Sequence, residues 1–324
     1  MPSSGAVIMF QFGGLLKIIE EYDIITLFRH AHPDCDAAGS QFGLKNWIEE
    51  NWPDKRVYAL GMEYCTQGSC WPLSDSVSKE DLKNSAAIIL DTANLERIDD
   101  DSWKLAKTLI KIDHHPNIQP YGDEQYVFVK SASTCEIVAD FMRQCPDKVV
   151  STKTAEFLFR GMLTDTLSFR TSNTTPHSLE TAGWISQFGV RIPDLNRELF
   201  DQDLESFKFA NMLRGSVQIR EGKMAYRIVS LEEMQEWDKP EKDVKNFIEE
   251  FGHVQDFEIY AIFCENNDTG TIVYNGSLRS KRVTINDVAE RFHGGGHKNA
   301  CGVKGLNPEE LEQLLEALYA KIPQ

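Results

Sequence analysis

The sequence predicts an α/β protein whose first domain has a mostly parallel sheet with flanking helices, followed by a smaller α+β domain. In the first half, short apolar runs alternate with amphipathic helical segments, as is typical of a parallel sheet. A polar, helical stretch follows at 192–216, and strand-like runs return after it. We therefore expect a first domain at 1–191, a helical linker at 192–216 and a second domain at 217–324.

The strands of the first domain are predicted from short runs of apolar and β-branched residues. Such runs are typical of strands that are buried on both faces, as the strands of parallel sheets are. Helices are expected between them, because apolar residues share one helical face in segments 42–48, 137–142 and 155–162. Strands are expected at 24–28, 86–90, 109–112 and 126–129.

The second domain has its own start and stop signals. Its last helix begins clearly, with Asn307 as the N-cap, Pro308 in the first turn and Glu310 three residues after the cap. The linker mixes charges with spaced Leu and Phe residues, so we expect one connecting helix there. Strands are expected at 223–229, 257–264 and 271–278, and helices at 284–292 and after Asn307.

Composition and charge restrict the class of protein. The 324 residues are 41% hydrophobic, enough for two cores, and a net charge of −16 argues against binding of long nucleic acid. No apolar run reaches the roughly 20 residues of a membrane helix, and the N-terminus lacks a signal-peptide pattern. Seven scattered cysteines without a CxxC pair suggest a reducing compartment. We expect a soluble, cytoplasmic protein without a membrane partner.

Carboxylates and imidazoles follow the predicted strands. "RHAHPDCD" comes after the first strand, "DTAN" after the second and "DHHP" after the third, while "TDT" follows a helix. Ligands bind at the carboxyl ends of strands in open α/β sheets. Taken alone, Asp36 and Asp165 would each be interpreted as a helix cap. Together, buried carboxylates without cations cost several kcal/mol per ion, so the pattern predicts a pair of divalent ions such as Mn²⁺, Fe²⁺ or Zn²⁺.

These segments carry a resemblance to a known family. "HAHPDCDAAGS", "ILDTAN", "IDHHP" and "LTDTLSF" resemble the four motifs of the DHH phosphoesterase family, while "SLRS" and "FHGGGHKNACG" resemble its DHH-associated substrate-binding domain. "TDTLSFRTSNTTP" is similar to the nanoRNase branch. That branch degrades very short RNA and removes phosphate from 3′-phosphoadenosine 5′-phosphate, and related members cleave pApA or cyclic di-AMP. The resemblance covers nearly the whole chain and implies a catalytic first domain.

The resemblance implies two metal ions, with Mn²⁺ the expected element, and a set of ligands. Asp91 would bridge the two ions, and His115 would face the substrate phosphate, so that both are catalytic. Asp113 would orient an imidazole from behind. One ion would be held by His30, Asp34 and Asp91, and the other by Asp36, Asp91, His114 and Asp165.

The family chemistry would then be hydrolysis of a phosphoester. The two ions would lower the pKa of a shared water, and the resulting hydroxide would attack phosphorus in line with the leaving oxygen. His115 would stabilise the phosphoryl charge or protonate the leaving group. The expected substrates are short RNA oligonucleotides or adenine dinucleotides, cleaved to mononucleotides. A homodimer is one assembly that we consider.

Substrate contacts are expected mainly from the second domain. Residues 271–305 contain six basic and two acidic side chains, so this segment carries a charge of +4. Within it, Arg279 and Ser280 are expected to contact phosphate, Arg279 through a bidentate contact. The run Gly294, Gly295 and Gly296, followed by His297, would let the backbone approach phosphate, although a flexible turn is the alternative.

Three further candidates come from the first domain. Arg170 would line the site, or belong to an ordinary turn. Ser133 and Thr134 would touch phosphate at a helix N-terminus, or merely cap that helix. No role is expected for His177. Two other functions remain open: an inorganic pyrophosphatase or exopolyphosphatase of the same superfamily, and a catalytically inactive nucleotide-binding regulator.

Overall fold

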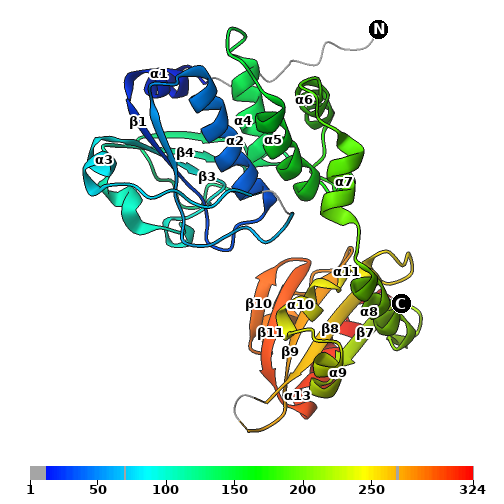
Figure 1. The fold of residues 1–324 in the computed structure, drawn as a ribbon. Helices are drawn as coiled ribbons and strands as arrows, with labels where there is room; N and C mark the ends of the chain where they lie inside the picture. Colours follow the sequence, from blue (N-terminus) through cyan, green and yellow to red (C-terminus); the bar gives the residue numbers. More distant parts are fainter. Residues whose placement is uncertain (1–11, 69–70, 268–269, 324) are drawn as a thin grey trace. The chain divides into compact units, whose positions relative to one another are not determined.

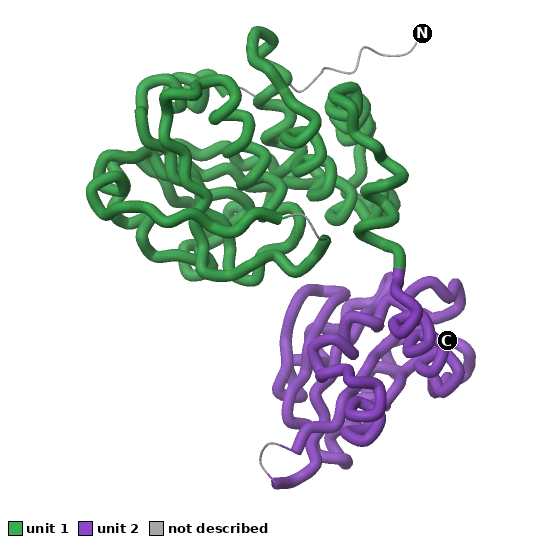
Figure 2. The backbone as a smooth tube through the Cα atoms, viewed as in Figure 1, with its two compact units in different colours: residues 1–201 green, residues 202–324 purple. Residues whose placement is uncertain are grey.

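The computed structural model describes residues 12–68, 71–267 and 270–323. The chain divides into two compact units, residues 1–201 and 202–324 (Figure 2). The division falls inside the segment that we expected to form one connecting helix. That segment instead contains α7 (Ile192–Phe200) and α8 (Leu204–Gly215). A new helix starts at α8 because Asp203 caps it, accepting a 2.7 Å hydrogen bond from the backbone N–H of Ser206.

The first unit contains a five-stranded parallel sheet in the order β2–β1–β3–β4–β5. This confirms the predicted fold class. The short strand β2 was not predicted, because its four residues include an exposed Arg56 and lack the apolar run of the central strands. The strands are β1 (Ile24–Phe28), β2 (Arg56–Ala59), β3 (Ala86–Leu90), β4 (Thr108–Asp113) and β5 (Glu124–Val127).

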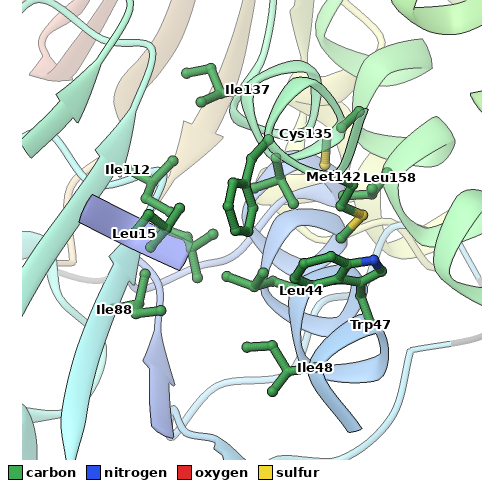
Figure 3. Packing of buried hydrophobic residues seen from close by; sticks show 14 of the residues in the cluster. Leu15, Leu44, Trp47, Ile48, Ile88, Ile112, Cys135, Ile137, Met142 and Leu158 are labelled. Carbon is green, nitrogen blue, oxygen red and sulfur yellow. The ribbon is translucent and has the colours of Figure 1, made fainter. Parts of the chain in front are cut away.

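Helices cover both faces of this sheet (Figure 1). Helices α1, α2 and α4 pack on one face, and α5 packs against α2 and α4. Figure 3 shows Trp47 of α2 and Leu15 of α1 on the same side as Ile112 of β4. Leu82 of α3 packs on the other face. Besides α7, the helices of this unit are α1 (Gly13–Glu21), α2 (Cys35–Asn51), α3 (Lys79–Asn84), the 3₁₀ helices η1 (Leu95–Arg97) and η2 (Asp101–Leu105), α4 (Thr134–Arg143), α5 (Thr152–Asp165) and α6 (Pro176–Ser186).

The second unit contains a six-stranded mixed sheet in the order β10–β11–β9–β8–β7–β6. Only β7 and β8 pair in parallel. Helices α8 to α11 contribute to a core on one face, and α12 and α13 to a core on the other. The strands are β6 (Gln218–Arg220), β7 (Met224–Val229), β8 (Ile259–Asn266), β9 (Val273–Ser280), β10 (Gly294–His297) and β11 (Ala300–Leu306). The helices are α9 (Leu231–Glu236), α10 (Glu241–Asn246), α11 (Glu249–Gly252), α12 (Asn286–Glu290) and α13 (Pro308–Tyr319).

Two features of the second unit bear on the sequence predictions. Helix α13 starts as expected, with the Asn307 and Glu310 side chains forming a reciprocal capping box. The glycine run 294–296 is neither a loop nor a flexible turn, because it forms strand β10, paired with β11. Glycine is disfavoured in strands, which is why the sequence did not predict this one. Within the described ranges, no helix is long and apolar enough to cross a membrane.

Candidate metal centre

The carboxyl ends of three neighbouring strands supply the first side chains of the site. His30 follows β1, Asp91 follows β3, and His114 follows Asp113, the last residue of β4. Because β1, β3 and β4 are adjacent and parallel, these residues reach the same edge of the sheet. Two helices complete the site, since Asp36 lies in the first turn of α2 and Asp165 is the last residue of α5.

One group of possible ligands surrounds His30. Its Nε2 atom lies 3.4 Å from Asp91 Oδ2 and 3.8 Å from Asp34 Oδ2. The ligand atoms of these three residues all lie within 4.8 Å of one another. The other ring nitrogen of His30, Nδ1, lies 2.8 Å from the carbonyl oxygen of Ala31. Donation from Nδ1 to that carbonyl leaves Nε2 free to bind a cation.

A second group surrounds His114. Its Nε2 atom lies 3.4 Å from Asp165 Oδ2, 3.5 Å from Asp91 Oδ1 and 3.9 Å from Asp36 Oδ2. The ligand atoms of Asp36, His114 and Asp165 again lie within 4.8 Å of one another. Asp91 turns Oδ2 toward His30 and Oδ1 toward His114, so it is the residue that the two groups share.

The backbone of Asp91 has a left-handed conformation, with φ at 51°. Aspartate tolerates this region better than most residues other than glycine. The Asp91 N–H donates to the carbonyl of Ile112 at 3.0 Å, and Oδ1 accepts a 3.1 Å hydrogen bond from the Thr134 hydroxyl. These contacts fix the shared carboxylate in one orientation.

Asp36 is fully buried and is held by a helix other than its own. Its two oxygens accept hydrogen bonds from the backbone N–H groups of Thr134 (2.7 Å) and Cys135 (2.8 Å), in the first turn of α4. The cap of α2 is Asp34, whose Oδ1 accepts from the N–H groups of Asp36 and Ala37 at 3.0 Å each. The capping role considered for Asp36 alone therefore belongs to Asp34, which keeps Oδ2 toward His30.

Asp165 lies at the carboxyl end of α5, so it does not cap a helix N-terminus. A negative charge at that end opposes the helix dipole. Burial and the charges of Asp36 and Asp91 raise the pKa of Asp165 well above its usual range. In the geometry of this site, Asp165 is placed to donate an oxygen to a cation.

The electrostatics of the centre favour bound cations. Burial and the charge of Asp91 raise the pKa of both Asp34 and Asp36, that of Asp36 to about 7. Burial also opposes ionisation of Asp91, yet the hydrogen bond from His30 and the charges of the neighbouring histidines lower its pKa to about 2. Divalent ions would relieve the repulsion among these carboxylates. The mixed oxygen and imidazole donors suit Mn²⁺, Fe²⁺ or Zn²⁺, so the residues fit two metal ions.

His115 lies next to the two groups, and its ring is held by Asp113. Its Nδ1 lies 2.9 Å from Asp113 Oδ1 and 3.4 Å from Asp91 Oδ1, and its side chain is 35% exposed. Asp113 is fully buried, and its Oδ2 pairs with the equally buried Nζ of Lys111 at 3.4 Å. The hydrogen bond to Asp113 raises the pKa of His115. Asp113 therefore has the geometry of a residue that orients an imidazole.

Two residues of the "HAHPDCD" stretch lie outside the centre. His32 is 84% exposed and pairs with Glu63, with 2.8 Å between Nδ1 and Oε2. Cys35 is buried in an apolar cluster with Phe42, Trp71 and other apolar residues. A separate pair, the half-buried His177 and the buried Asp140, joins α6 to α4, with 2.6 Å between Nε2 and Oδ2.

Comparison with known proteins assigns the chain to a family. Residues 24–162 match the family described as "DHH family, N-terminal domain", and residues 221–323 match "DHHA1 domain". A "Bifunctional oligoribonuclease and PAP phosphatase NrnA" from Bacillus subtilis is 30% identical, covering 94% of this chain and 96% of that protein. A "Probable bifunctional oligoribonuclease and PAP phosphatase NrnA" from Streptococcus mutans is 33% identical over 96% and 98%. The chain belongs to the DHH family.

A solved structure gives the same fold for this DHH chain. An exopolyphosphatase-related protein from Bacteroides fragilis superposes with a TM-score of 0.78 and covers 94% of the chain and 95% of its own length. At 23% identity this likeness shows the DHH and DHHA1 architecture.

The DHHA1 unit brings some of the predicted substrate contacts together. His297 of β10 pairs with Ala300 of β11, which pairs in turn with Arg279 of β9, so these side chains share one face of the sheet. Gly295 lies on the same face, two positions before His297. A Cβ atom at Gly295 would meet no atom within 4 Å, so this face is open there.

The other predicted DHHA1 residues lie on the opposite face. Ser280 is 7% exposed, and its hydroxyl donates to the carbonyl of Val283 at 2.6 Å. Gly294 and Gly296 are needed for close packing: a Cβ atom would lie 2.7 Å from Val303 Cγ1 in one case and 2.9 Å from Cys301 Cα in the other. The structure therefore separates Ser280, Gly294 and Gly296 from Arg279.

The positive charge counted along the DHHA1 segment is partly neutralised by acidic partners outside that segment. Arg282 donates to Glu258 of the preceding loop, with 2.8 Å between Nε and Oε2. Arg279 lies 3.6 Å from Glu249 Oε1. These partners lie outside residues 271–305, so a count of charges along that segment does not include them. The positive charge on this surface is therefore smaller than the +4 predicted from the segment.

In the DHH unit, Ser133 and Arg170 have local roles. Ser133 is fully buried, and its hydroxyl accepts a 3.0 Å hydrogen bond from the N–H of Glu136, so it caps α4. Of the two roles considered for Ser133, capping is the one that the structure shows. Arg170 is exposed and donates from Nε to the carbonyl of Leu167 at 3.0 Å, within the turn after α5.

The sequence did not predict how two residues, Thr134 and Gly161, shape the centre. Thr134 supplies both a backbone N–H to Asp36 and a hydroxyl to Asp91. Gly161 of α5 lies against Asp36, where a Cβ atom would be 2.8 Å from Oδ1 and 2.9 Å from Cα. A glycine inside an apolar helix is a signal of close packing, but the sequence alone does not say against what.

Proposed function

We propose that this DHH protein is a metal-dependent phosphoesterase that hydrolyses short oligoribonucleotides and dinucleotides such as pApA to mononucleotides. It would also remove phosphate from 3′-phosphoadenosine 5′-phosphate, and cyclic di-AMP is a further candidate substrate. The observation that carries the proposal is the pair of ligand groups that share Asp91. Relatives named for these activities, 30% and 33% identical over nearly their full length, support it.

Two Mn²⁺ ions are the proposed cofactors. When bound, they would activate a water molecule and neutralise charge on the phosphoryl oxygens. Asp91 would contribute one oxygen to each group, held by the Thr134 hydroxyl. One group would be His30, Asp34 and Asp91, and the other would be Asp36, Asp91, His114 and Asp165.

His115 is the proposed proton donor or charge stabiliser for the leaving oxygen. Its Nδ1 is engaged with Asp113, which leaves Nε2 as the ring atom available to substrate. Fixing the ring in advance avoids reorganisation during the reaction. Asp113 acts through His115 and is therefore a positioning residue.

The DHHA1 unit would hold the rest of the substrate. The face that carries Arg279, His297 and Gly295 offers a guanidinium, an imidazole and an open glycine backbone. These groups suit phosphate and a nucleoside edge. Ser280, Gly294 and Gly296 would support this surface from behind. We propose that the protein acts in the cytoplasm, where short RNA fragments arise.

A side-by-side assay of substrates tests the proposal. The purified protein is incubated with Mn²⁺ and di- to pentaribonucleotides, pApA, cyclic di-AMP, 3′-phosphoadenosine 5′-phosphate and pyrophosphate, and the products are separated by chromatography. We expect mononucleotides from the dinucleotides and pApA at rates well above pyrophosphate hydrolysis. A wide preference for pyrophosphate would instead establish the pyrophosphatase alternative. Tight nucleotide binding without turnover would establish an inactive regulator.

A further inference from the structure

A pocket of about 340 Å³ opens directly on the metal centre within the first unit. Two of the proposed metal ligands, Asp34 and Asp165, line it. Their side chains are 44% and 21% exposed, so both carboxylates are accessible from the pocket. The volume lies within the range of about 300–1,000 Å³ that is common for small-molecule sites.

Part of the pocket wall is apolar, while Gln67, Gly68 and Thr164 also line the pocket. The apolar part is formed by Leu167, in the turn after α5, and by Leu199 and Phe200 at the end of α7. Leu167 is 44% exposed and Phe200 is 39% exposed. A concave apolar wall that faces polar ligands is the usual composition of a site for a molecule with both a charged and an apolar part.

The turn that carries Leu167 is held in an uncommon conformation. Leu167, Ser168 and Phe169 all have left-handed backbones, with φ at 46°, 58° and 63°. Side-chain and backbone hydrogen bonds hold the turn. Ser168 donates from its hydroxyl to Asn196 Oδ1 of α7 at 2.6 Å, and its N–H donates to the carbonyl of Leu163 at 2.8 Å. Strained backbone of this kind is found at functional sites.

The α7 side of the pocket is fixed as well. Arg160 of α5 is 5% exposed and donates to both oxygens of Glu198, at 3.2 Å from Nε and 2.9 Å from Nη2. This bidentate pair lies next to Leu199 in sequence and anchors α7 on α5. The pocket therefore has a preformed shape, because the turn at Leu167 is tied to α7 and α7 is tied to α5, the helix that ends in Asp165.

We propose that this pocket binds one nucleobase of the substrate. Leu167 and Phe200 would be specificity residues that pack against the flat face of that base. The inference rests on the proposed function. A phosphate bound by metal ions that Asp34 and Asp165 help to hold would bring its attached nucleoside to the adjoining apolar wall. Bases stack on aromatic and apolar side chains irrespective of sequence. Pyrophosphate has no apolar group that could contact this wall, so the pocket favours nucleotides over pyrophosphate.

The test uses Leu167→Ala and Phe200→Ala, with Leu179→Ala as the matched control. Leu179 is 54% exposed on α6 and does not line the pocket. Alanine keeps the Cβ atom at position 167, so the left-handed backbone there remains as unfavourable as it is with leucine. The affinity for a diadenylate with a non-hydrolysable methylene bridge is measured by calorimetry. The kcat and KM are measured for pApA and for two abasic analogues, each lacking one adenine.

We expect both pocket variants to raise Kd and KM for the diadenylate about tenfold, within the range of a lost stacking contact, while kcat stays within about twofold. One abasic analogue should show the raised KM already with the unmodified protein and should be insensitive to both variants. The inference is overturned if the variants match Leu179→Ala, or if both variants weaken both abasic analogues equally. Absence of pApA hydrolysis by the unmodified protein would instead contradict the proposed function itself.

Discussion

The carboxylate of Asp36 accepts a 2.7 Å hydrogen bond from the backbone N–H of Thr134, which joins the start of α2 to the start of α4. The same threonine donates its hydroxyl to Asp91 at 3.1 Å. One residue therefore sets the positions of a ligand from the second group and of the shared ligand. Small changes in the packing of α2, α4 and α5 should consequently alter metal binding.

A pair of glycine substitutions tests this dependence on packing. In Gly161→Ala, the new Cβ would lie 2.8 Å from Asp36 Oδ1, so we expect a loss of about 1–3 kcal/mol in unfolding free energy from overpacking. The Mn²⁺ affinity should fall with it. In Gly183→Ala on α6, no atom lies within 4 Å of the new Cβ, and the gain in helix propensity should stabilise the protein by about 0.5–1 kcal/mol. Urea unfolding measures the stability of each variant, and Mn²⁺ titration measures its metal affinity. Equal Mn²⁺ affinity in the two variants would show that packing at Gly161 does not affect metal binding.

Replacement of Asp91 should be the most damaging single change at the centre, and Asp91→Asn tests it with the least effect on the fold. Asparagine tolerates the left-handed backbone at φ 51° and removes only the shared charge, so the fold should survive. Because the metals supply several kcal/mol of transition-state stabilisation, we expect turnover of pApA to fall by about 10³-fold or more. Asp91→Ala should lose activity equally and also lose about 1–2 kcal/mol of stability, since alanine disfavours that backbone. Turnover of Asp91→Asn near that of the unmodified protein would refute the site assignment.

Asp113→Asn should show whether Asp113 only stabilises the fold or also orients His115. Lys111 would remain buried without its charge partner, 3.4 Å away, so we expect a loss of about 3–5 kcal/mol in unfolding free energy. Adding Lys111→Met should restore most of that stability, because it removes the unpaired charge. The double variant should still show a kcat about 10–100-fold below normal, because His115 has lost its anionic partner. A double variant with normal kcat would mean that Asp113 only stabilises the fold.

The glycine run of the DHHA1 unit provides a second matched pair. Gly294→Ala would place a Cβ 3.0 Å from the carbonyl oxygen of Ala289 and 2.7 Å from Val303, so we expect it to destabilise the protein by about 1–3 kcal/mol. Gly295→Ala meets no atom within 4 Å and should leave the melting temperature unchanged. Because Gly295 shares a face with Arg279, Gly295→Ala should nevertheless raise the KM for pApA several-fold. A normal KM would remove Gly295 from the substrate surface.

The convergence of the proposed metal ligands could be predicted from sequence because it follows from a rule of parallel sheets. His30, Asp91 and His114 each follow a recognisable apolar strand, and the ends of such strands share one edge. The contacts that fix these ligands could not be predicted. Asp36 and Thr134 are 98 residues apart, and their hydrogen bond depends on how α2 and α4 pack.

The second unit was harder to predict for two physical reasons. The glycine run has low strand propensity, so β10 is visible only through its pairing with β11. The charge of Arg282 is balanced by Glu258, which lies outside the segment in which the charges were counted. The connecting helix was likewise expected to be continuous, but the cap at Asp203 starts a new helix in the second unit.

Titration of metal-free protein with Mn²⁺, while pApA hydrolysis is followed, shows whether each chain works with two metal ions. Protein is stripped with a chelator, and activity is measured against equivalents of Mn²⁺ at a protein concentration well above the dissociation constants. Because the two proposed ligand groups share Asp91, we expect little activity without metal and a plateau at two equivalents per chain. A plateau at one equivalent, or full activity in the stripped protein, would refute the two-metal centre.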